Sequence, residues 1–146
     1  MNDIKIELPN FAVLIVDDDD VSAESVIRSF KRHSIKCDIV VACDGLEALD
    51  IINNKHDTKF LPDNFIVLLD LNMPRMDGFG FLEAVRSDIN LKRTVIFILT
   101  TSARDTDRLR AYNDNVAGYM IKSAVGPQFA LLAELITKYT QSVILP

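Results

Sequence analysis

Two apolar runs of the chain end in acidic residues, at positions where carboxylates could do chemistry. Residues 65–69 are followed by Asp70, and residues 11–16 are followed by four aspartates at positions 17–20. Open α/β sheets place their functional groups at the carboxyl ends of buried strands. Grouped carboxylates repel one another, and a hard divalent cation such as Mg²⁺ removes that repulsion. The pattern predicts an Mg²⁺ site at which Asp70 is either a ligand or a nucleophile that attacks phosphorus.

A hydroxyl and an ammonium group follow two later apolar runs. Thr100 comes after residues 95–99, and Lys122 comes after residues 117–121. At the same edge of a sheet, both groups could hold a phosphoryl oxygen. Taken singly, Thr100 is more often a helix cap and Lys122 a surface charge, just as a single aspartate is more often a solvated turn residue. The shared position after strands favours one joint site.

The elements that must position these groups alternate along the chain. Strand-length apolar runs occupy residues 11–16, 39–41, 65–69, 95–99 and 117–121. Helical spacing of apolar residues follows each run: around residues 27–30, over 44–54, 78–87 and 104–113, and from residues 126–127 through 139. Fully apolar runs are typical of parallel strands covered on both faces. The order predicts a doubly wound five-stranded parallel sheet, the flavodoxin-like (βα)5 arrangement of the α/β class.

Particular residues are expected to shape these helices. Asp44 can cap the helix that starts beside it, and Leu46 belongs to the apolar stripe of that helix. Leu109 and Tyr112 mark the apolar positions of residues 104–113. Residues 53–64 are polar and long for a connection, so they are interpreted as a mobile insertion.

Composition limits the classes of protein to which the chain can belong. Its 146 residues fit one domain, 1–146, with a core at about 11–140. A net charge of −5 argues against general binding to nucleic acid or to an anionic membrane. No apolar run approaches the roughly 20 residues that span a bilayer. Cys37 and Cys43 are interpreted as ordinary thiols of a cytoplasmic protein, and His33 and His56 as surface residues.

The residues after the strands resemble the receiver domain of two-component response regulators over roughly residues 11–140. Four motifs carry the resemblance: Val16-Asp17-Asp18, the sequence LLDLNMPRMDG at 68–78, LTTS at 99–102 and GYMIK at 118–122. The spacings of 30 positions from Asp70 to Thr100 and 22 from Thr100 to Lys122 are typical of that family. LTTS is also similar to single-domain receivers that are paired with bacterial phytochromes.

The resemblance implies a chemistry for the acidic site. Asp70 would accept a phosphoryl group from a phosphohistidine on a sensor histidine kinase. Asp17, Asp18, Asp70 and the backbone carbonyl of Asn72 would hold Mg²⁺. Lys122 would pair with Asp70 before phosphorylation and with the phosphoryl oxygens after it. The protein would then be a phospho-acceptor rather than an enzyme, apart from Mg²⁺-dependent self-phosphorylation and self-dephosphorylation.

The resemblance also implies a switch and partners. Thr100 would hydrogen-bond the phosphoryl group, Tyr119 would change rotamer with it, and Asn72 and Ser102 would flank the path of the attacking water. The face formed by residues 100–122 and the last helix is the predicted output surface. The expected partners are a sensor histidine kinase, with a phytochrome as one option, or a phosphotransfer protein, and a downstream protein target. Neither nucleic acid nor membrane is expected, and monomer and homodimer both stay open.

Two features depart from the family pattern or leave its register open. Ser123 stands where the family usually has a proline after the lysine. We expect either a trans bond with a reshaped loop or a strained cis bond, which costs about 3 kcal/mol. Among the four aspartates, Asp17 and Asp18 are the predicted metal ligands because the apolar run ends just before them. Asp19 is the alternative ligand, and Asp20 is expected to begin the first helix.

Three other functions compete with the phospho-acceptor. A degenerate receiver would bind proteins without being phosphorylated, but Asp70, Thr100 and Lys122 are all present. A Mg²⁺-dependent phosphatase would need an acid two positions after its nucleophile, where this chain has Asn72, which cannot serve as an acid–base catalyst. A flavin carrier shares the fold class, but the four aspartates after the first strand would repel a flavin phosphate.

Overall fold

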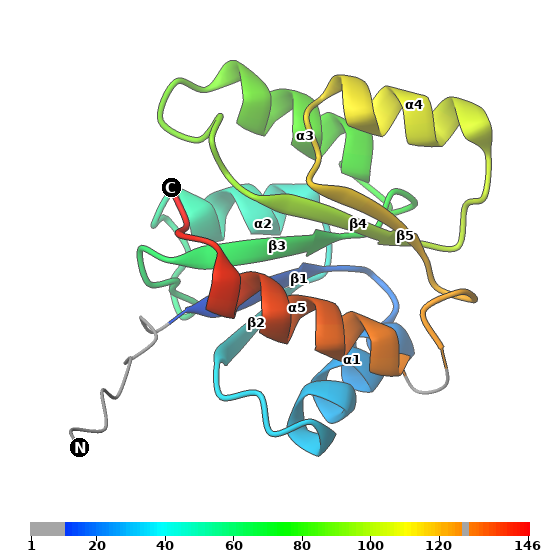
Figure 1. The fold of residues 1–146 in the computed structure, drawn as a ribbon. Helices are drawn as coiled ribbons and strands as arrows, with labels where there is room; N and C mark the ends of the chain where they lie inside the picture. Colours follow the sequence, from blue (N-terminus) through cyan, green and yellow to red (C-terminus); the bar gives the residue numbers. More distant parts are fainter. Residues whose placement is uncertain (1–10, 127–128) are drawn as a thin grey trace.

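Runs of apolar residues form the centre of a parallel sheet in the computed structural model, which describes residues 11–126 and 129–146 (Figure 1). The described residues contain five strands in the spatial order β2-β1-β3-β4-β5. Their bounds are Ala12–Val16 (β1), Asp38–Ala42 (β2), Phe65–Leu69 (β3), Ile96–Thr100 (β4) and Gly118–Ile121 (β5). All neighbouring strands pair in parallel. The central strands β1, β3 and β4 are almost wholly buried, as continuous apolar runs require.

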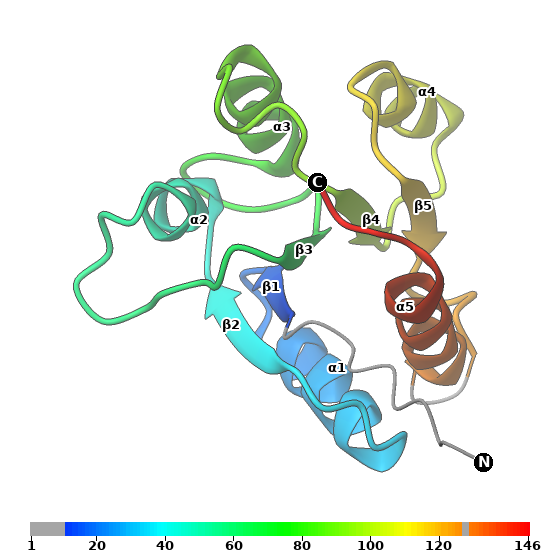
Figure 2. The ribbon, with the colours of Figure 1, turned by 60° about the vertical axis from the view of Figure 1, so that its left-hand side comes forward.

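Five helices of the described residues cover both faces of the sheet. They are Asp20–Arg32 (α1), Gly45–Ile52 (α2), Gly78–Ser87 (α3), Asp105–Asn113 (α4) and Ala130–Ser142 (α5). Figure 2 shows α1 and α5 on one face and α2, α3 and α4 on the other. Each face has its own apolar core, since alternate strand residues point to opposite sides. The predicted doubly wound (βα)5 fold is confirmed.

Strand register brings the acidic segments together. Val16 is paired with Leu69 on one side and with Ala42 on the other. The next residues continue the ladder, because the backbone N–H of Asp70 donates to the Val16 carbonyl at 2.9 Å and that of Asp17 donates to the Ala42 carbonyl at 3.0 Å. Asp17 and Asp70 therefore leave the sheet side by side at its carboxyl edge.

The predicted boundaries hold within two residues for most elements, but the apolar faces of two helices differ. In α4, Leu109 and Tyr112 are exposed and Ala111 is fully buried. In α2, Leu46 is 42% exposed, while Ala48 and Ile51 are buried. In α4 the small Ala111 side chain lets the helix approach the sheet closely, whereas α2 also buries the large side chain of Ile51. The expected start of the last helix at residues 126–127 falls partly outside the described residues, and its described part begins at Ala130.

At the opposite edge of the sheet, the Arg86 side chain binds four backbone carbonyls. Its guanidinium donates to the carbonyls of Lys92 and Thr94, before β4, and to those of Asp114 and Asn115, which follow α4, at 2.7–3.1 Å. A planar guanidinium offers five N–H donors in a fixed arrangement, which suits such a cluster of acceptors. Arg86 thus joins α3 to the loop before β4 and to the end of α4.

Candidate functional site

Asp17, Asp18 and Asp70 form an acidic cluster after β1 and β3. Carboxylate oxygens of these three residues all lie within 4.8 Å of one another. Asp17 and Asp70 are buried, with 5% and 7% of their surface exposed, and Asp18 is exposed. The structure therefore brings together the three carboxylates that were predicted as metal ligands, in a site open to solvent on the Asp18 side.

Asp19, the alternative ligand, has a different role. Its side chain accepts hydrogen bonds from the Val21 N–H at 3.0 Å and from the Ser22 hydroxyl at 3.0 Å, and so caps the start of α1. These bonds hold the pKa of Asp19 below its ordinary value, the Ser22 hydroxyl contributing most. Asp20 is the first residue of α1, as predicted. Asp19 therefore caps the helix, and Asp17 and Asp18 form the cluster together with Asp70.

Lys122 reaches into the cluster from the end of β5. Its Nζ atom lies 2.8 Å from Asp17 Oδ2, 3.2 Å from Ser22 Oγ and 3.4 Å from Asp70 Oδ2. The expected pairing with Asp70 is thus present, but Asp17 is the closer partner. Burial disfavours the ammonium, yet Asp17 and Asp70 outweigh it and raise the pKa of Lys122 above its ordinary value. The side chain is therefore held as a cation.

The backbone after Lys122 resolves the alternative raised by Ser123. No cis peptide bond occurs in residues 11–126 or 129–146, so the Lys122–Ser123 bond is trans. The Lys122 N–H donates to the Thr100 carbonyl at 2.8 Å, and the Ala124 N–H donates to the Ile121 carbonyl at 2.9 Å. A turn with a trans bond therefore delivers the lysine to the site.

Negative charge is in excess at the cluster. Within the described residues, three carboxylates face a single ammonium group. Burial raises the pKa of the Asp17 carboxyl above its ordinary value, and the hydrogen bond from Lys122 offsets this only in part. Oxygen donors with unbalanced negative charge suit a hard cation, and Mg²⁺ and Mn²⁺ both accept such ligands. The chemistry of the donor set therefore fits a divalent cation.

The loop between β3 and α3 passes close beneath Asp70. A Cβ atom at Gly78 would lie 2.5 Å from the Asp70 carbonyl oxygen and 2.7 Å from Leu71 Cα, so only glycine allows this approach. The Gly78 N–H donates to the Leu71 carbonyl at 3.0 Å. Asn72 follows the buried Leu71 and is exposed, with its N–H 3.4 Å from Asp70 Oδ1. The loop thus keeps Asn72 beside the acidic cluster.

The predicted switch residues meet at the start of α4. Thr100 is fully buried at the end of β4, and its Oγ1 lies 3.4 Å from the Ser102 N–H. Tyr119 donates its hydroxyl to the Ser102 carbonyl at 2.9 Å. The Ser102 hydroxyl donates to Asp107 Oδ2 at 2.6 Å. Ser102 is therefore bonded to both predicted switch residues and to the first turn of α4. The sequence predicted only that Ser102 lies beside the path of the attacking water, and it did not predict these contacts.

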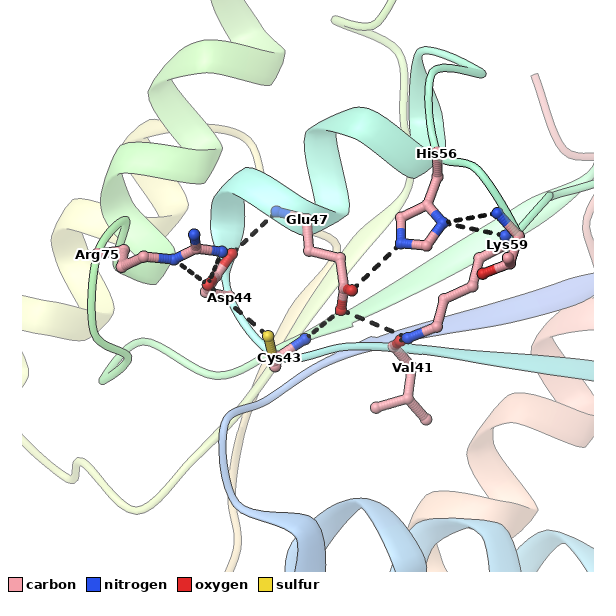
Figure 3. A network of polar contacts seen from close by, with 8 residues as sticks. Val41, Cys43, Asp44, Glu47, His56, Lys59 and Arg75 are labelled. Carbon is pink, nitrogen blue, oxygen red and sulfur yellow. Dashed lines mark hydrogen bonds and ion pairs between the residues drawn. The ribbon is translucent and has the colours of Figure 1, made fainter.

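A second polar network surrounds the start of α2 (Figure 3). Asp44 caps the helix, as predicted, by accepting from the Glu47 N–H at 2.9 Å, and its other oxygen accepts from Arg75 Nε at 2.6 Å. His56 Nε2 lies 3.2 Å from Glu47 Oε2, so the prediction of a surface histidine was wrong: the His56 side chain is 18% exposed. Nine residues and a helix end separate Glu47 from His56, so no local pattern could have found this contact.

The same network fastens the insertion at residues 53–64 to the edge strand β2. Lys59 Nζ donates to the Val41 carbonyl at 2.7 Å and lies 3.5 Å from Glu47 Oε1. That oxygen also accepts from the Cys43 N–H at 2.8 Å. Binding the Val41 carbonyl occupies a backbone acceptor that an edge strand otherwise leaves open. Figure 3 shows Glu47 between the β2 end and the insertion.

Comparisons with known proteins agree with this geometry. Residues 13–133 match the family model described as "Response regulator receiver domain". The probable methanogenesis regulatory protein FilR2 of Methanothrix harundinacea is 34% identical over 113 residues, which cover 77% of this chain and 72% of that protein. Response regulator Rcp1 of Synechocystis sp. is 27% identical over 139 residues, 94% of this chain and 95% of that protein.

Solved structures resemble the whole fold. The Mn(2+)-bound form of Rcp1 superposes with a TM-score of 0.79 at 27% identity and covers 92% of this chain and 98% of that one. The phosphorylated cyanobacterial phytochrome response regulator RcpA has a TM-score of 0.81 at 27% identity, and the match covers 94% of this chain and 99% of that one. Among the helices of the described residues, none is long and apolar enough to cross a membrane.

Proposed function

Because the chain belongs to the response regulator receiver domain family and is thus a signalling module of two-component systems, we propose that Asp70 is its phospho-acceptor. The observation that carries this proposal is the placement of Asp70: its buried carboxylate shares one cluster with Asp17 and Asp18 and lies 3.4 Å from Lys122 Nζ. Phosphorylation of the similar protein RcpA supports it. The proposal takes residues 1–146 as a single receiver domain.

The proposed reaction transfers a phosphoryl group from a phosphohistidine. A carboxylate oxygen of Asp70 attacks phosphorus and forms the new P–O bond. The P–N bond breaks, and its electron pair remains on the imidazole nitrogen of the donor. Lys122 balances the negative charge on the transferred oxygens, a role suited to an ammonium group held in a buried acidic site. Self-phosphorylation from a small acyl phosphate follows the same course, with a carboxylate as the leaving group.

Mg²⁺ is the proposed cofactor of this step. Asp17, Asp18, Asp70 and the backbone carbonyl of Asn72 would hold it, with Asp17 acting through water. The cation supplies charge neutralisation for the carboxylates and for the incoming phosphoryl oxygens. The Mn(2+)-bound form of Rcp1 supports a divalent cation here, and the oxygen-only donor set favours Mg²⁺.

The proposed response to phosphorylation begins at Thr100. Its hydroxyl would turn to the phosphoryl oxygens and leave the Ser102 N–H, which lies 3.4 Å away. Ser102 also accepts from the Tyr119 hydroxyl, so the rotamer of Tyr119 would change with it. The face formed by residues 100–122 and α5 is the proposed output surface. The amide shifts of residues 100–122 should change when beryllofluoride mimics the phosphoryl group, and unchanged shifts would contradict this surface.

The proposed partners follow from the family and the similar proteins. A sensor histidine kinase or a phosphotransfer protein would supply the phosphoryl group, and a downstream protein would read the output surface. RcpA is a phytochrome response regulator, which supports a phytochrome as the kinase. We propose a cytoplasmic site of action, with neither nucleic acid nor a membrane as partner, and a monomer or homodimer in solution.

The test is incubation with acetyl phosphate and Mg²⁺, followed by intact-mass measurement. Wild type should gain one phosphoryl group, and Asp70→Asn should gain none. Asp77→Asn is the matched control, because Asp77 lies in the same loop but caps α3 by accepting from the Gly80 N–H at 2.8 Å, a role that asparagine retains. An adduct that persists in Asp70→Asn would move the acceptor elsewhere. No adduct in wild type would favour a protein-binding module that is not phosphorylated.

A further inference from the structure

The loop between β3 and α3 is anchored to the start of α2. Arg75 in this loop donates from Nε to Asp44 Oδ2 at 2.6 Å, and its NH2 group contacts the same oxygen. One residue later, the Met76 carbonyl accepts from the Gly45 N–H at 3.1 Å. A Cβ atom at Gly45 would lie 2.7 Å from the Met76 side chain, so the helix start and the loop are in close contact.

The Arg75 ion pair has one exposed and one buried partner. Asp44 has a side chain that is 4% exposed and also caps α2, whereas the Arg75 side chain is 60% exposed. A fixed carboxylate that already binds a backbone N–H offers a rigid acceptor, unlike most surface ion pairs, in which both side chains are mobile. Figure 3 shows Arg75 reaching Asp44 from the loop.

The backbone of Arg75 has an unusual conformation. Its φ angle of 61° is left-handed, a conformation that residues other than glycine seldom adopt. Between the buried Leu71 and Met76, the polar contacts recorded in the described part of the chain are the Asp44–Arg75 pair and the 3.4 Å approach of the Asn72 N–H to Asp70. Asn72 is three residues before Arg75. Together with the neighbouring bond from the Gly45 N–H to the Met76 carbonyl, the ion pair therefore restrains the segment that carries the Asn72 carbonyl.

We infer that Arg75 is a positioning residue for divalent-cation binding: by holding the loop to Asp44, it keeps the Asn72 carbonyl directed at the Asp17, Asp18 and Asp70 cluster. This inference rests on the proposed function, which assigns that carbonyl to the cation. It adds a residue that touches neither the cation nor the phosphoryl group.

The loss of charge and the loss of positioning predict opposite changes in Mg²⁺ affinity for the same substitution. Arg75→Ala removes a positive charge from the acidic side of the molecule, so charge alone would make Mg²⁺ bind more tightly. Loss of positioning would make Mg²⁺ bind more weakly, since residues that orient metal ligands typically contribute tenfold or more to affinity. The sign of the change therefore separates the two effects.

The experiment is calorimetric titration of Mg²⁺ into the full chain, with the melting temperature recorded for each variant. We expect the Mg²⁺ dissociation constant to rise about tenfold in Arg75→Ala and less in Arg75→Lys, which keeps the charge and one contact. Lys59→Met is the matched control: it removes a positive charge from the same network, where Lys59 contacts Glu47 and Val41 but no residue of the loop. Its dissociation constant should equal that of wild type or be lower.

The outcomes distinguish this inference from the proposed function. Weaker Mg²⁺ binding in Arg75→Ala with partial rescue in Arg75→Lys supports the positioning role. Unchanged or tighter binding in a folded Arg75→Ala, as in Lys59→Met, overturns it and leaves the metal site intact. If wild type binds no Mg²⁺ at all, the proposed metal site is wrong, and the inference falls with it.

Discussion

Two acidic clusters lie near the carboxyl edge of the sheet, and they differ in how their charge is balanced. In the cluster after β1 and β3, Asp17, Asp18 and Asp70 lie within 4.8 Å of one another and share Lys122. Burial raises the pKa of Asp17, because charge there is costly. This cluster stores electrostatic repulsion that a bound cation can relieve.

In the cluster at the start of α2, the charge of the acids is matched by partners within the protein. We call this the balanced cluster, and the cluster of Asp17, Asp18 and Asp70 the unbalanced cluster. Asp44 binds Arg75 and the Glu47 N–H, while Glu47 binds Lys59, His56 and a backbone N–H. Each carboxylate has its own partners, and the pKa of Glu47 lies below its ordinary value because these bonds outweigh the burial. Carboxylates whose charge is left unbalanced are thus expected to bind a ligand, whereas carboxylates with matched partners are expected to stabilise the fold.

The largest expected effect comes from removing Lys122, the one ammonium group that the described residues place in the unbalanced cluster. Lys122→Met should slow phosphorylation by acetyl phosphate about 100-fold or more, because a preorganised group that stabilises the transferred oxygens is lost. The rate is followed by intact mass over time. Lys59→Met removes the same charge from the balanced cluster and should react at the wild-type rate. A Lys122→Met protein as reactive as wild type would contradict the role of this lysine.

The next effect concerns stability with and without the cation. Mg²⁺ at 100 times its dissociation constant should add about 2.7 kcal/mol to the free energy of unfolding of wild type. Asp18→Asn should lose most of this gain. In chelator, Asp18→Asn should be at least as stable as wild type, because one repelling charge is gone. Thermal unfolding with and without Mg²⁺ measures the gain from the cation and the stability in chelator. A wild-type melting temperature that does not change with Mg²⁺ would contradict the proposed difference between the two clusters.

A smaller effect is expected in the balanced cluster. Glu47→Ala removes acceptors for the Cys43 N–H, His56 and Lys59, and should lower the free energy of unfolding by about 1 kcal/mol. The midpoint of urea unfolding measures this loss. Phosphorylation by acetyl phosphate should be unchanged. A Glu47→Ala variant that keeps full stability but is phosphorylated slowly would reverse the roles assigned to the two clusters.

The smallest effect is a pH dependence. Burial alone would raise the pKa of Asp44, but the Glu47 N–H and Arg75 outweigh it and hold the pKa below its ordinary value of 3.8. The folded state therefore keeps this charge at a lower pH than the unfolded state does. The resulting stabilisation is present above about pH 4 and is lost as the pH falls through the lowered pKa. Urea unfolding of Asp44→Asn should show a smaller loss of stability below about pH 4 than wild type. An equally steep loss in both proteins would exclude Asp44 as a source of the pH dependence.

The fold and the unbalanced cluster follow from features that are local in sequence. Apolar runs predict β3 at Phe65–Leu69 and a helix at Gly78–Ser87 with the bounds observed. Carboxylates directly after such runs must emerge at one edge of a parallel sheet, so Asp17 and Asp70 could be placed without knowing any side-chain contact.

The contacts that could not be predicted join residues far apart in the chain. Lys122 is 105 residues from Asp17, its closer partner, and only the strand register decides between Asp17 and Asp70. The balanced cluster depends on an insertion that meets α2 in space, so His56 carries no local signal. In α4, the spacing of Leu109 and Tyr112 suits a packed face, but the buried Ala111 shows that the helix packs through its smallest side chain.

The guanidinium of Arg86 has a mechanical consequence for α4. One end of this helix is tied, through Asp114 and Asn115, to α3, while the other end meets the rest of the protein through Ser102. A helix of nine residues, about 14 Å long, that is held at one end and displaced at the other would rotate instead of sliding. We therefore expect α4 to rotate about the end that Arg86 holds. The displacement of the helix is then greatest at its start, beside Thr100, and least at its end, at the sheet edge opposite the acidic cluster.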